Sequence, residues 1–470
     1  MAKVSSEEID AYVERRWPLF LEDLARLVSI DSSLDDEHAA PAAPFGPGPR
    51  AALDEMLAIA SRMGLEVADG DGYAGYADLP GSEADSQQVA VIGHVDVVPA
   101  AQGWTFPPFA LTEKDGILVG RGVADDKGLL LCALYALAFW MERGVSLRHA
   151  IRFIFGCNEE TGMKEIPYYL ERNDPPAFLF TPDAEFPLCH GEKGLFGCTV
   201  KASVPKGAIV SFDGGSASNA VPARAHAVVR CAVEDVPAAE GIEVQRVGEG
   251  EVSVVAHGRG AHASLPDGGV NAIARLASVL SRCPACTDDE RAFMAFAAEQ
   301  AFCIDGSAAG VAASDEVFAS LTSVVGRMGS YEEGYFFTVD VRFPTSIDAV
   351  RLEEAYRVVS SSHGARIEVT RAQEPFVVDP DSAAVRALTD AYREQTGRPS
   401  VPFTMGGATY AREFPRAVSF GAGDASFALP SWVGGMHGAD EGMSEESLKS
   451  ALAVYIRAFG NLAEVEDVSS

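Results

Sequence analysis

Histidine and carboxylate side chains, the ligands that proteins use for divalent metals, gather in short stretches of the 470-residue chain. These stretches are residues 93–96, 120–128, 157–162 and 181–187. Each borders an apolar run or a predicted helix start. Ligands of open α/β sheets bind beyond the carboxyl ends of the strands. The stretches therefore predict one polar site, to which the late His437 can be added.

The first stretch holds His94 and Asp96, two residues apart on an expected strand and so on one face of it. A histidine in such a pair can ligate a metal while the carboxylate orients its ring. A buried polar pair without a metal is the alternative, because His-x-Asp is a common pattern.

The remaining stretches supply carboxylates. Asp125 and Asp126 lie between glycines at the start of an expected helix, where an acid can bridge metals or cap the helix. Glu159 and Glu160 lie in the stretch that follows the apolar run 151–155, and they repel each other unless a cation or a proton separates their roles. Solvated loop acids are the alternative, which the position after a buried strand disfavours. Asp183 also follows an apolar run.

The elements around these stretches predict an α/β fold. Residues 89–92 and 151–155 are typical of strands buried on both faces of a largely parallel sheet, with a helix over 128–143 between them. Residues 193–376 instead show alternating segments interleaved with helical ones, which predicts an α+β insertion with mostly antiparallel sheets. The chain then returns to buried strands and closes with a helix that Ser444 can cap.

Composition excludes several classes of function. The 37 basic and 68 acidic residues sum to a net charge of −31, which repels phosphate backbones and anionic lipids. We therefore expect no nucleic-acid partner and no membrane partner. The polar start of the chain is unlike a signal peptide, and no apolar run is long enough to span a bilayer. The expected location is the cytoplasm.

The eight cysteines accordingly predict reduced thiols. Cys283 and Cys286 form the only Cys-x-x-Cys pattern. One such pair, with no second pair nearby, does not by itself establish zinc binding or redox chemistry.

Taken in order, the motifs resemble the aminoacylase/carboxypeptidase-G/succinyl-diaminopimelate-desuccinylase family of co-catalytic zinc metallopeptidases. The likeness is greatest to its PepV-like, carnosinase-related dipeptidase branch and covers nearly the whole chain. It rests on residues 44–48, 93–99, 125–128, 182–187 and 191–194.

The resemblance implies a fold and a domain organisation. The expected fold is a zinc-peptidase-type mixed, mainly parallel sheet flanked by helices. A discontinuous catalytic domain would comprise residues 1–190 and 386–470. A large inserted α+β lid domain of two subdomains would occupy residues 191–385. Because so large a lid can mimic a partner subunit, the resemblance implies a monomer.

The resemblance also implies a ligand set for two divalent metal ions. His94 and Asp183 match the ligands of one metal, Glu160 and His437 match those of the other, and Asp125 matches the residue that bridges both. Zinc is the expected metal, with manganese and cobalt as alternatives, because sites of histidine and carboxylate accept all three.

Catalytic roles follow from the same likeness. Glu159 matches the general base of the family, and Asp96 matches the residue that steers His94. His262 matches a lid histidine that stabilises the oxyanion. At Asn158 many relatives have an acid instead, but the ligand positions are intact.

Three further residues match substrate-binding positions of the family. Asn219 and Arg342 match positions that anchor the substrate, and Arg412 lies in a glycine-rich loop that matches one near the substrate. For these residues and His262 the alternatives are a turn-forming asparagine, a solvated strand arginine and a core histidine.

The expected function is that of a metal-dependent dipeptidase. Its substrates would be small peptides with a free C-terminal carboxylate, hydrolysed through a metal-bridging water and a glutamate base. An N-acyl amino acid deacylase or desuccinylase of the same fold is one alternative. An inactive relative that binds metals or peptides is the other.

Overall fold

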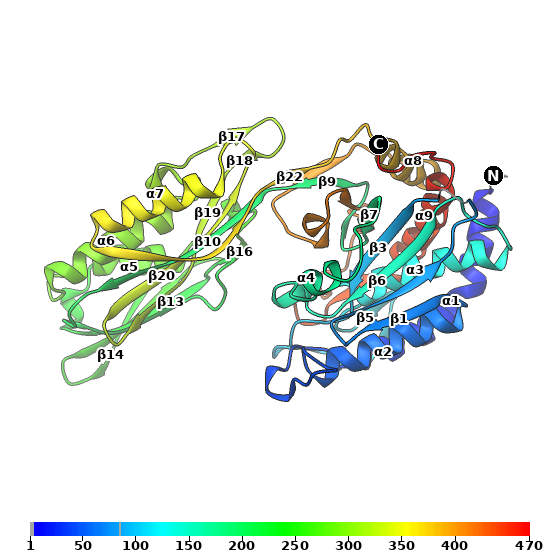
Figure 1. The fold of residues 1–470 in the computed structure, drawn as a ribbon. Coiled ribbons are helices and arrows are strands. Elements are labelled where there is room, and N and C mark those ends of the chain that lie inside the picture. Colours follow the sequence, from blue (N-terminus) through cyan, green and yellow to red (C-terminus); the bar gives the residue numbers. More distant parts are fainter. Residues whose placement is uncertain (1–3, 84–85) are drawn as a thin grey trace. The chain divides into compact units, whose positions relative to one another are not determined.

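The computed structural model describes residues 4–83 and 86–470 and divides them into two compact units (Figure 1). Unit 1 consists of Met1–His190, Val377–Phe403 and Ala408–Ser470, and unit 2 of Gly191–Phe376 and Thr404–Gly407. The chain returns to unit 1 at Val377, earlier than the predicted residue 386. The reason is that helix α8 (Ala383–Thr396), together with the segment before it, packs with the elements of unit 1.

Unit 1 is built on a nine-stranded mixed sheet of order β1-β2-β6-β3-β7-β24-β9-β22, in which β23 also pairs with β9. The strands are β1 (Glu66–Gly70), β2 (Ala74–Leu79), β3 (Gln88–His94), β6 (Ala150–Gly156), β7 (Phe178–Thr181), β9 (Cys189–Glu192), β22 (Phe376–Val377), β23 (Phe403–Met405) and β24 (Ala417–Ser419). The neighbours β6, β3, β7 and β24 are parallel, whereas β1, β2 and β9 pair antiparallel. This arrangement confirms the predicted mixed α/β fold.

Helices flank the sheet of unit 1. They are α1 (Ser6–Val28), α2 (Pro47–Arg62), α3 (Lys127–Glu142), α4 (Glu165–Leu170), α8 and α9 (Glu445–Leu462). Nearly every residue of α3 is buried, because α1 and α9 pack against it. A helix that is apolar all round has this central position in a core. Ser444 caps α9 as predicted, since its hydroxyl accepts a hydrogen bond from the N–H of Ser447.

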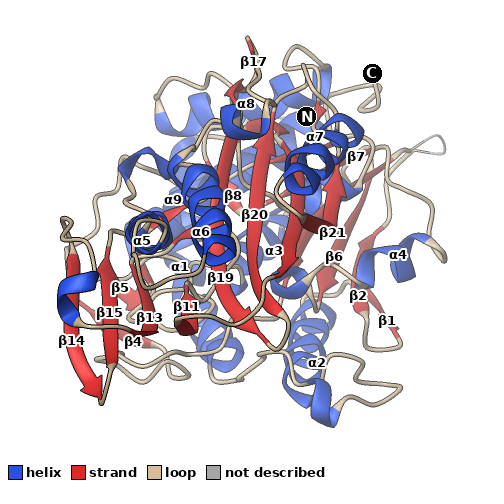
Figure 2. Ribbon diagram, turned by 90° about the vertical axis from the view of Figure 1, so that its left-hand side faces the viewer, coloured by secondary structure: helices blue, strands red, loops and turns tan. Residues whose placement is uncertain are grey.

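Unit 2 is an eight-stranded sheet of order β14-β15-β13-β11-β19-β20-β10-β21. The strands are β10 (Gly194–Ser203), β11 (Ile209–Gly214), β13 (Arg224–Arg230), β14 (Ile242–Gly248), β15 (Glu251–His257), β19 (Thr322–Tyr331), β20 (Gly334–Phe343) and β21 (Ala365–Gln373). Helices α5 (Ala272–Leu280), α6 (Asp288–Phe302) and α7 (Ala349–Ser362) lie along one face of it (Figure 2). Burial alternates along β13 and β15, as expected of antiparallel strands covered on one face.

One continuous eight-stranded sheet runs through the predicted insertion. Strands β11 and β19 pair at Asp213 with Gly329 and at Gly214 with Met328, and this ladder joins two groups of strands into one sheet. A single hydrophobic core runs beneath both groups. The pairing of β11 with β19 joins strands that lie far apart in the sequence, so local patterns could not predict it.

Short ladders complete the fold. They are formed by β4 (Thr112–Lys114), β5 (Ile117–Val119) and β26 (Gly442–Ser444), by β8 (Ala184–Glu185) and β25 (Ala422–Gly423), by β12 (Ala220–Val221) and β16 (Ala261–His262), and by β17 (Ser314–Asp315) and β18 (Ala319–Ser320). Among the helices that the structure describes, none is long and apolar enough to cross a bilayer.

Candidate metal centre

The parallel strands of unit 1 bring most of the predicted ligands to one edge of the sheet. His94 is the last residue of β3, and Asp183 follows the neighbouring strand β7. Glu159 and Glu160 form a short 3₁₀ turn, η2 (Glu159–Thr161), after β6 on the other side of β3. Because the three strands are adjacent and parallel, their carboxyl ends place these side chains together.

Asp125, just before α3, lies between two histidines. His94 Nε2 is 3.0 Å from Asp125 Oδ1, and His437 Nε2 is 2.9 Å from Asp125 Oδ2. His437 Nε2 also lies 3.0 Å from Glu160 Oε2, and His94 Nε2 lies 3.8 Å from Asp183 Oδ2. The Nε2 atom of each histidine therefore faces two carboxylates, and Asp125 is shared between them.

The donor atoms are close enough to share a metal ion. One group within 4.8 Å of one another comes from His94, Glu159 and Asp183, and a second from His94, Asp125 and Glu160. Imidazole nitrogens and carboxylate oxygens are the donors that zinc and similar divalent ions take in proteins. Carboxylates gathered in this way out of water need compensating positive charge. The residues present therefore fit divalent cations.

Proton affinities at the site reflect the same crowding of charge. Burial, reinforced by the charge of Asp125, raises the pKa of Asp183 to about 7. Hydrogen bonds with Asp125 and Glu160 raise the pKa of His437 to about 10. Burial opposes the charged form of His94, but contacts with Asp125 and Asp96 hold its pKa well above the usual value. Protons and metal ions thus compete for one set of atoms.

Asp96 has contacts that the sequence did not predict. Its carboxylate accepts hydrogen bonds from the N–H groups of Glu159 and Glu160, both at 3.2 Å, and so fixes the start of η2. His94 Nδ1 lies 2.9 Å from the main-chain oxygen of Asp96 and 3.5 Å from its Oδ1. The main-chain oxygen therefore accounts for most of the ring orientation, and Nε2 is directed towards the carboxylates.

A buried ion pair missing from the predictions joins the loop of His437 to that of Asp125. Arg121 Nη1 donates to Glu441 Oε2, and both side chains are almost fully buried. Arg121 Nη2 donates to the main-chain oxygens of His437 and its successor, both at 3.3 Å. The other oxygen of Glu441 accepts N–H groups from residues 122 and 124. Arg121 lies in the stretch 120–128 noted in the sequence, and Glu441 lies four residues after His437, which was the only signal for them.

Asn158 shows why an amide suits its position. Its N–H donates to Glu165 Oε1 at 3.1 Å, and its side-chain Oδ1 accepts the N–H of Lys164 at 3.2 Å. Its Nδ2 also donates to Thr161. An acid could not supply that donor when ionised. The departure from the family pattern therefore stabilises the turn that carries the two glutamates.

The predicted lid residues His262 and Asn219 lie side by side in unit 2. His262 pairs with Ala220 in the β12–β16 ladder, and the next residue, Ala263, donates its N–H to the Asn219 oxygen at 2.9 Å. The His262 side chain is exposed, and its Nδ1 lies 2.7 Å from Ser264 Oγ. The structure therefore does not support a core histidine here.

Arg342, near the end of β20, is buried and not solvated. Its Nε lies 2.7 Å and its Nη2 3.2 Å from the two oxygens of Asp340, and its Nη1 donates to the Gly406 oxygen at 3.2 Å. The guanidinium plane is thus held by a bidentate pair. Arg412 lies in unit 1, in the 3₁₀ turn η6 (Tyr410–Glu413).

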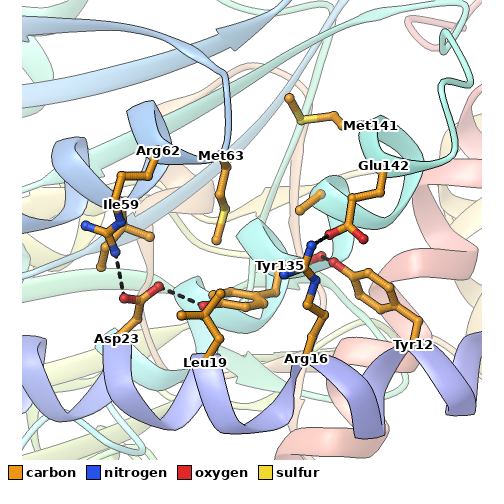
Figure 3. Close-up of a pocket in the computed structure, with 11 residues that line it drawn as sticks. Tyr12, Arg16, Leu19, Asp23, Ile59, Arg62, Met63, Tyr135, Met141 and Glu142 are labelled. Atoms are coloured by element: carbon orange, nitrogen blue, oxygen red, sulfur yellow. Dashed lines mark hydrogen bonds and ion pairs between the residues drawn. The ribbon is translucent and has the colours of Figure 1, made fainter.

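A separate cavity of about 400 Å³ lies between α1, α2 and α3 (Figure 3). Ion pairs between Arg16 and Glu142 and between Arg62 and Asp23 lie along it. Asp23 is buried and accepts a hydrogen bond from the Tyr135 hydroxyl at 2.7 Å. The lining residues include none of the predicted ligands, so this cavity is distinct from the candidate metal centre.

Comparison with known proteins identifies the family. Residues 90–461 match the model of peptidase family M20/M25/M40. The chain belongs to this family. The M20/M25/M40 assignment confirms the resemblance found in the sequence and makes the protein a hydrolase that acts on peptide bonds.

Relatives of known name extend over almost the whole chain. The Beta-Ala-Xaa dipeptidase of Lactobacillus delbrueckii subsp. lactis is 32% identical over 474 residues, covering 97% of this chain and 98% of that protein. Human carnosine dipeptidase 1 has the same fold, with a TM-score of 0.60, 16% identity, and coverage of 98% and 100%. The metallo-carboxypeptidase Sso-CP2 of Sulfolobus solfataricus also matches in fold, with a TM-score of 0.59, 15% identity, and coverage of 95% and 99%.

The buried ion pair gives a prediction about stability. Replacing Arg121 by alanine should lower the free energy of unfolding by about 3–5 kcal/mol, because the Glu441 carboxylate stays buried without its cation. Arg15→Ala removes an exposed pair with Glu142 and is the control, with a much smaller effect expected. Urea denaturation followed by circular dichroism measures both. Similar losses in the two variants would contradict the role of Arg121.

Proposed function

We propose that this protein is a metal-dependent dipeptidase that cleaves dipeptides with a free C-terminal carboxylate. The observation that carries the proposal is the position of Asp125 between His94 and His437, with further carboxylates beside each histidine. The named dipeptidase that is 32% identical over 97% of the chain supports the choice of substrate.

The proposed ligands fall into two sets around Asp125. His94 and Asp183 would hold one cation and Glu160 and His437 the other, with one oxygen of Asp125 directed to each set. Zinc is the proposed metal, with manganese and cobalt as alternatives. When bound, two divalent cations supply Lewis-acid activation of a water molecule and of the scissile carbonyl.

Glu159 is the proposed general base. Its carboxylate belongs to the cluster of His94 and Asp183 without being needed as a ligand in the proposed sets. Burial raises the pKa of its carboxyl well above the usual value, which suits a group that takes a proton near neutral pH. Its carboxylate would accept a proton from the attacking water and return it to the leaving amine. Asp96 would keep its main chain in place.

Roles on the substrate side rest on the family resemblance. We propose His262 as the donor that stabilises the oxyanion and Arg342 as the partner of the substrate carboxylate, with Asn219 and Arg412 as further contacts. The pairing of Arg342 with Asp340 supports its role, because it holds the planar fork in one orientation. We also propose that the protein is a monomer and that it is located in the cytoplasm.

A mixed panel of dipeptides, tripeptides and N-acyl amino acids tests the function. We expect cleavage confined to dipeptides, restored by zinc or manganese after chelation, because the carboxylate cluster needs cations to work. Mass spectrometry of the products measures it. Turnover of N-acyl amino acids alone would transfer the protein to the deacylase branch, and no turnover with any metal would reject the proposed activity.

Glu159 can be tested apart from the metal ligands. Glu159→Gln should lower kcat by about 10²–10⁴-fold while metal content stays unchanged, because only proton transfer is lost. Glu171→Gln, an exposed substitution in the same unit, is the control and should keep full activity. Steady-state kinetics and metal analysis by mass spectrometry provide the two readouts. Loss of metal with the activity would instead make Glu159 a ligand.

The role of His262 has a matched control in the same unit. His262→Ala should lower kcat by about 10²-fold or more with little change in metal affinity, because one oxyanion donor is removed. His257→Ala alters another exposed histidine, paired with Glu243, and should have no such effect. Kinetics on one dipeptide and metal titration of both variants measure this. Unchanged turnover in His262→Ala would exclude the oxyanion role.

A further inference from the structure

A buried tyrosine connects two turns of unit 1 that carry different parts of the candidate site. Tyr410 is the first residue of η6, the turn that also holds Arg412. Its side chain is fully buried, and its ring lies edge to face with the ring of His94, with the centroids 6.4 Å apart. The Tyr410 hydroxyl donates a hydrogen bond to Glu165 Oε1, at the start of α4. Tyr410 therefore lies beside a proposed metal ligand and contacts α4 through its hydroxyl.

Glu165 in turn holds the main chain at the start of η2. Its Oε1 accepts the N–H of Asn158 at 3.1 Å, one residue before the paired glutamates. The next two N–H groups, those of Glu159 and Glu160, donate to the carboxylate of Asp96. Two buried carboxylates thus accept three successive N–H groups. The first N–H groups of a helical turn have no partner within the turn, so these side chains satisfy them.

The Tyr410 hydroxyl is needed because Glu165 is out of contact with water. The Glu165 side chain is fully buried, and its other oxygen, Oε2, has no hydrogen-bond partner among the residues that the structure describes. Burial, reinforced by the charge of Asp96, raises the pKa of Glu165 to about 7, whereas the hydrogen bond from Tyr410 acts in the opposite direction. A buried carboxylate with too few donors is costly. The hydroxyl therefore stabilises and orients the oxygen to which Asn158 donates.

The strand before η2 leaves room for this contact. Gly156 is the last residue of β6. A Cβ atom at this position would lie 1.9 Å from the Tyr410 hydroxyl oxygen and 2.8 Å from Glu165 Oε1. Both distances are well below a van der Waals contact of about 3.5 Å, so the contact requires glycine here. Three separate segments of unit 1, namely β6, α4 and η6, are thus matched to one another at this point.

The turn that carries Tyr410 is itself anchored. The Thr409 hydroxyl oxygen accepts the N–H of Ala411 at 3.1 Å and caps η6. The same oxygen lies 3.0 Å from Ser419 Oγ, at the end of β24. Both Thr409 and Ser419 are buried. The Tyr410 hydroxyl therefore projects from a turn that is fixed to the central sheet, which allows it to hold a neighbouring group in place.

We propose that Tyr410 and Glu165 are positioning residues that fix η2, and with it the carboxylates of Glu159 and Glu160, for hydrolysis. The kinetic part of this inference rests on the proposed function, whereas the effect on η2 does not. Neither residue touches the substrate in this scheme. The Tyr410 hydroxyl orients the Glu165 carboxylate, that carboxylate holds the N–H of Asn158, and the proposed base follows directly. A purely structural contact would lower stability without a selective loss of kcat.

The kinetic test uses the full chain with Tyr410→Phe, which removes the hydroxyl and keeps the buried ring. At saturating metal we expect kcat on a dipeptide to fall by about 10-fold with little change in KM, because the base and a proposed ligand are less well placed. Tyr12→Phe is the matched control. It removes another buried hydroxyl of unit 1, which donates to the Tyr135 oxygen at 2.9 Å, and should keep the wild-type kcat. Unchanged kcat in Tyr410→Phe, or equal losses in the two variants, would overturn the proposal.

Glu165 allows a rescue experiment. Glu165→Ala removes the acceptor and should lower kcat at least as much as Tyr410→Phe does. Glu165→Gln keeps an acceptor oxygen for the Asn158 N–H and the Tyr410 hydroxyl, and should retain most of the wild-type kcat. Equal losses in the two Glu165 variants would contradict a positioning role. Tyr410→Phe decides the matter if Glu165→Ala does not fold.

Hydrogen exchange separates this inference from the proposed function, because it requires no turnover. Mass spectrometry of the peptide 157–163 measures how often the N–H groups of η2 open to solvent. Exchange should be faster in Tyr410→Phe than in the wild type and unchanged in Tyr12→Phe, because the Asn158 N–H loses a fixed acceptor. A wild type that cleaves no peptide but shows this pattern would reject the proposed activity and support the positioning of η2. Unchanged exchange in Tyr410→Phe would refute that positioning.

Discussion

The gathering of carboxylates around two histidines at the ends of parallel strands is the constraint on which unit 1 depends. Asp125, Glu160 and Asp183 all face an imidazole nitrogen within 4 Å. Ionised oxygens held so close together repel one another and lose hydration, so the cluster persists only with protons or cations among its members. The raised pKa of Asp183 and that of His437 express this requirement. A divalent cation meets it with more charge than a proton does.

Holding such a cluster in place requires contacts that are themselves charged and buried. The Asp96 carboxylate secures the N–H groups of the paired glutamates, and the Arg121–Glu441 pair ties the loop of His437 to that of Asp125. A buried ion pair adds little net stability compared with apolar packing, but it is costly to break and orients its neighbours. These contacts therefore mainly fix the positions of the loops that carry the candidate ligands. A hydrolytic site needs such fixed positions more than it needs extra stability.

Unit 2 is held together mainly by its hydrophobic core rather than by a cluster of charged side chains. Its single antiparallel sheet is covered by helices on one face, and the ladder between β11 and β19 unites two groups of strands over one core. Buried polar contacts are local there, such as the bidentate pair of Arg342 with Asp340.

The sequence by itself determined the α/β class, the family and the ligand candidates, because short motifs after apolar runs depend on local chemistry. His94 and Glu160 could be predicted as ligands in this way, because their residue types and their positions at expected strand ends are visible in the sequence. Only the tertiary structure decided that Asp96 holds η2 through its carboxylate, that Arg121 pairs with Glu441, and that the insertion is one sheet. The physical reason is that each of these contacts joins residues far apart in the chain, and neither periodicity nor spacing records which distant groups the packed core brings together.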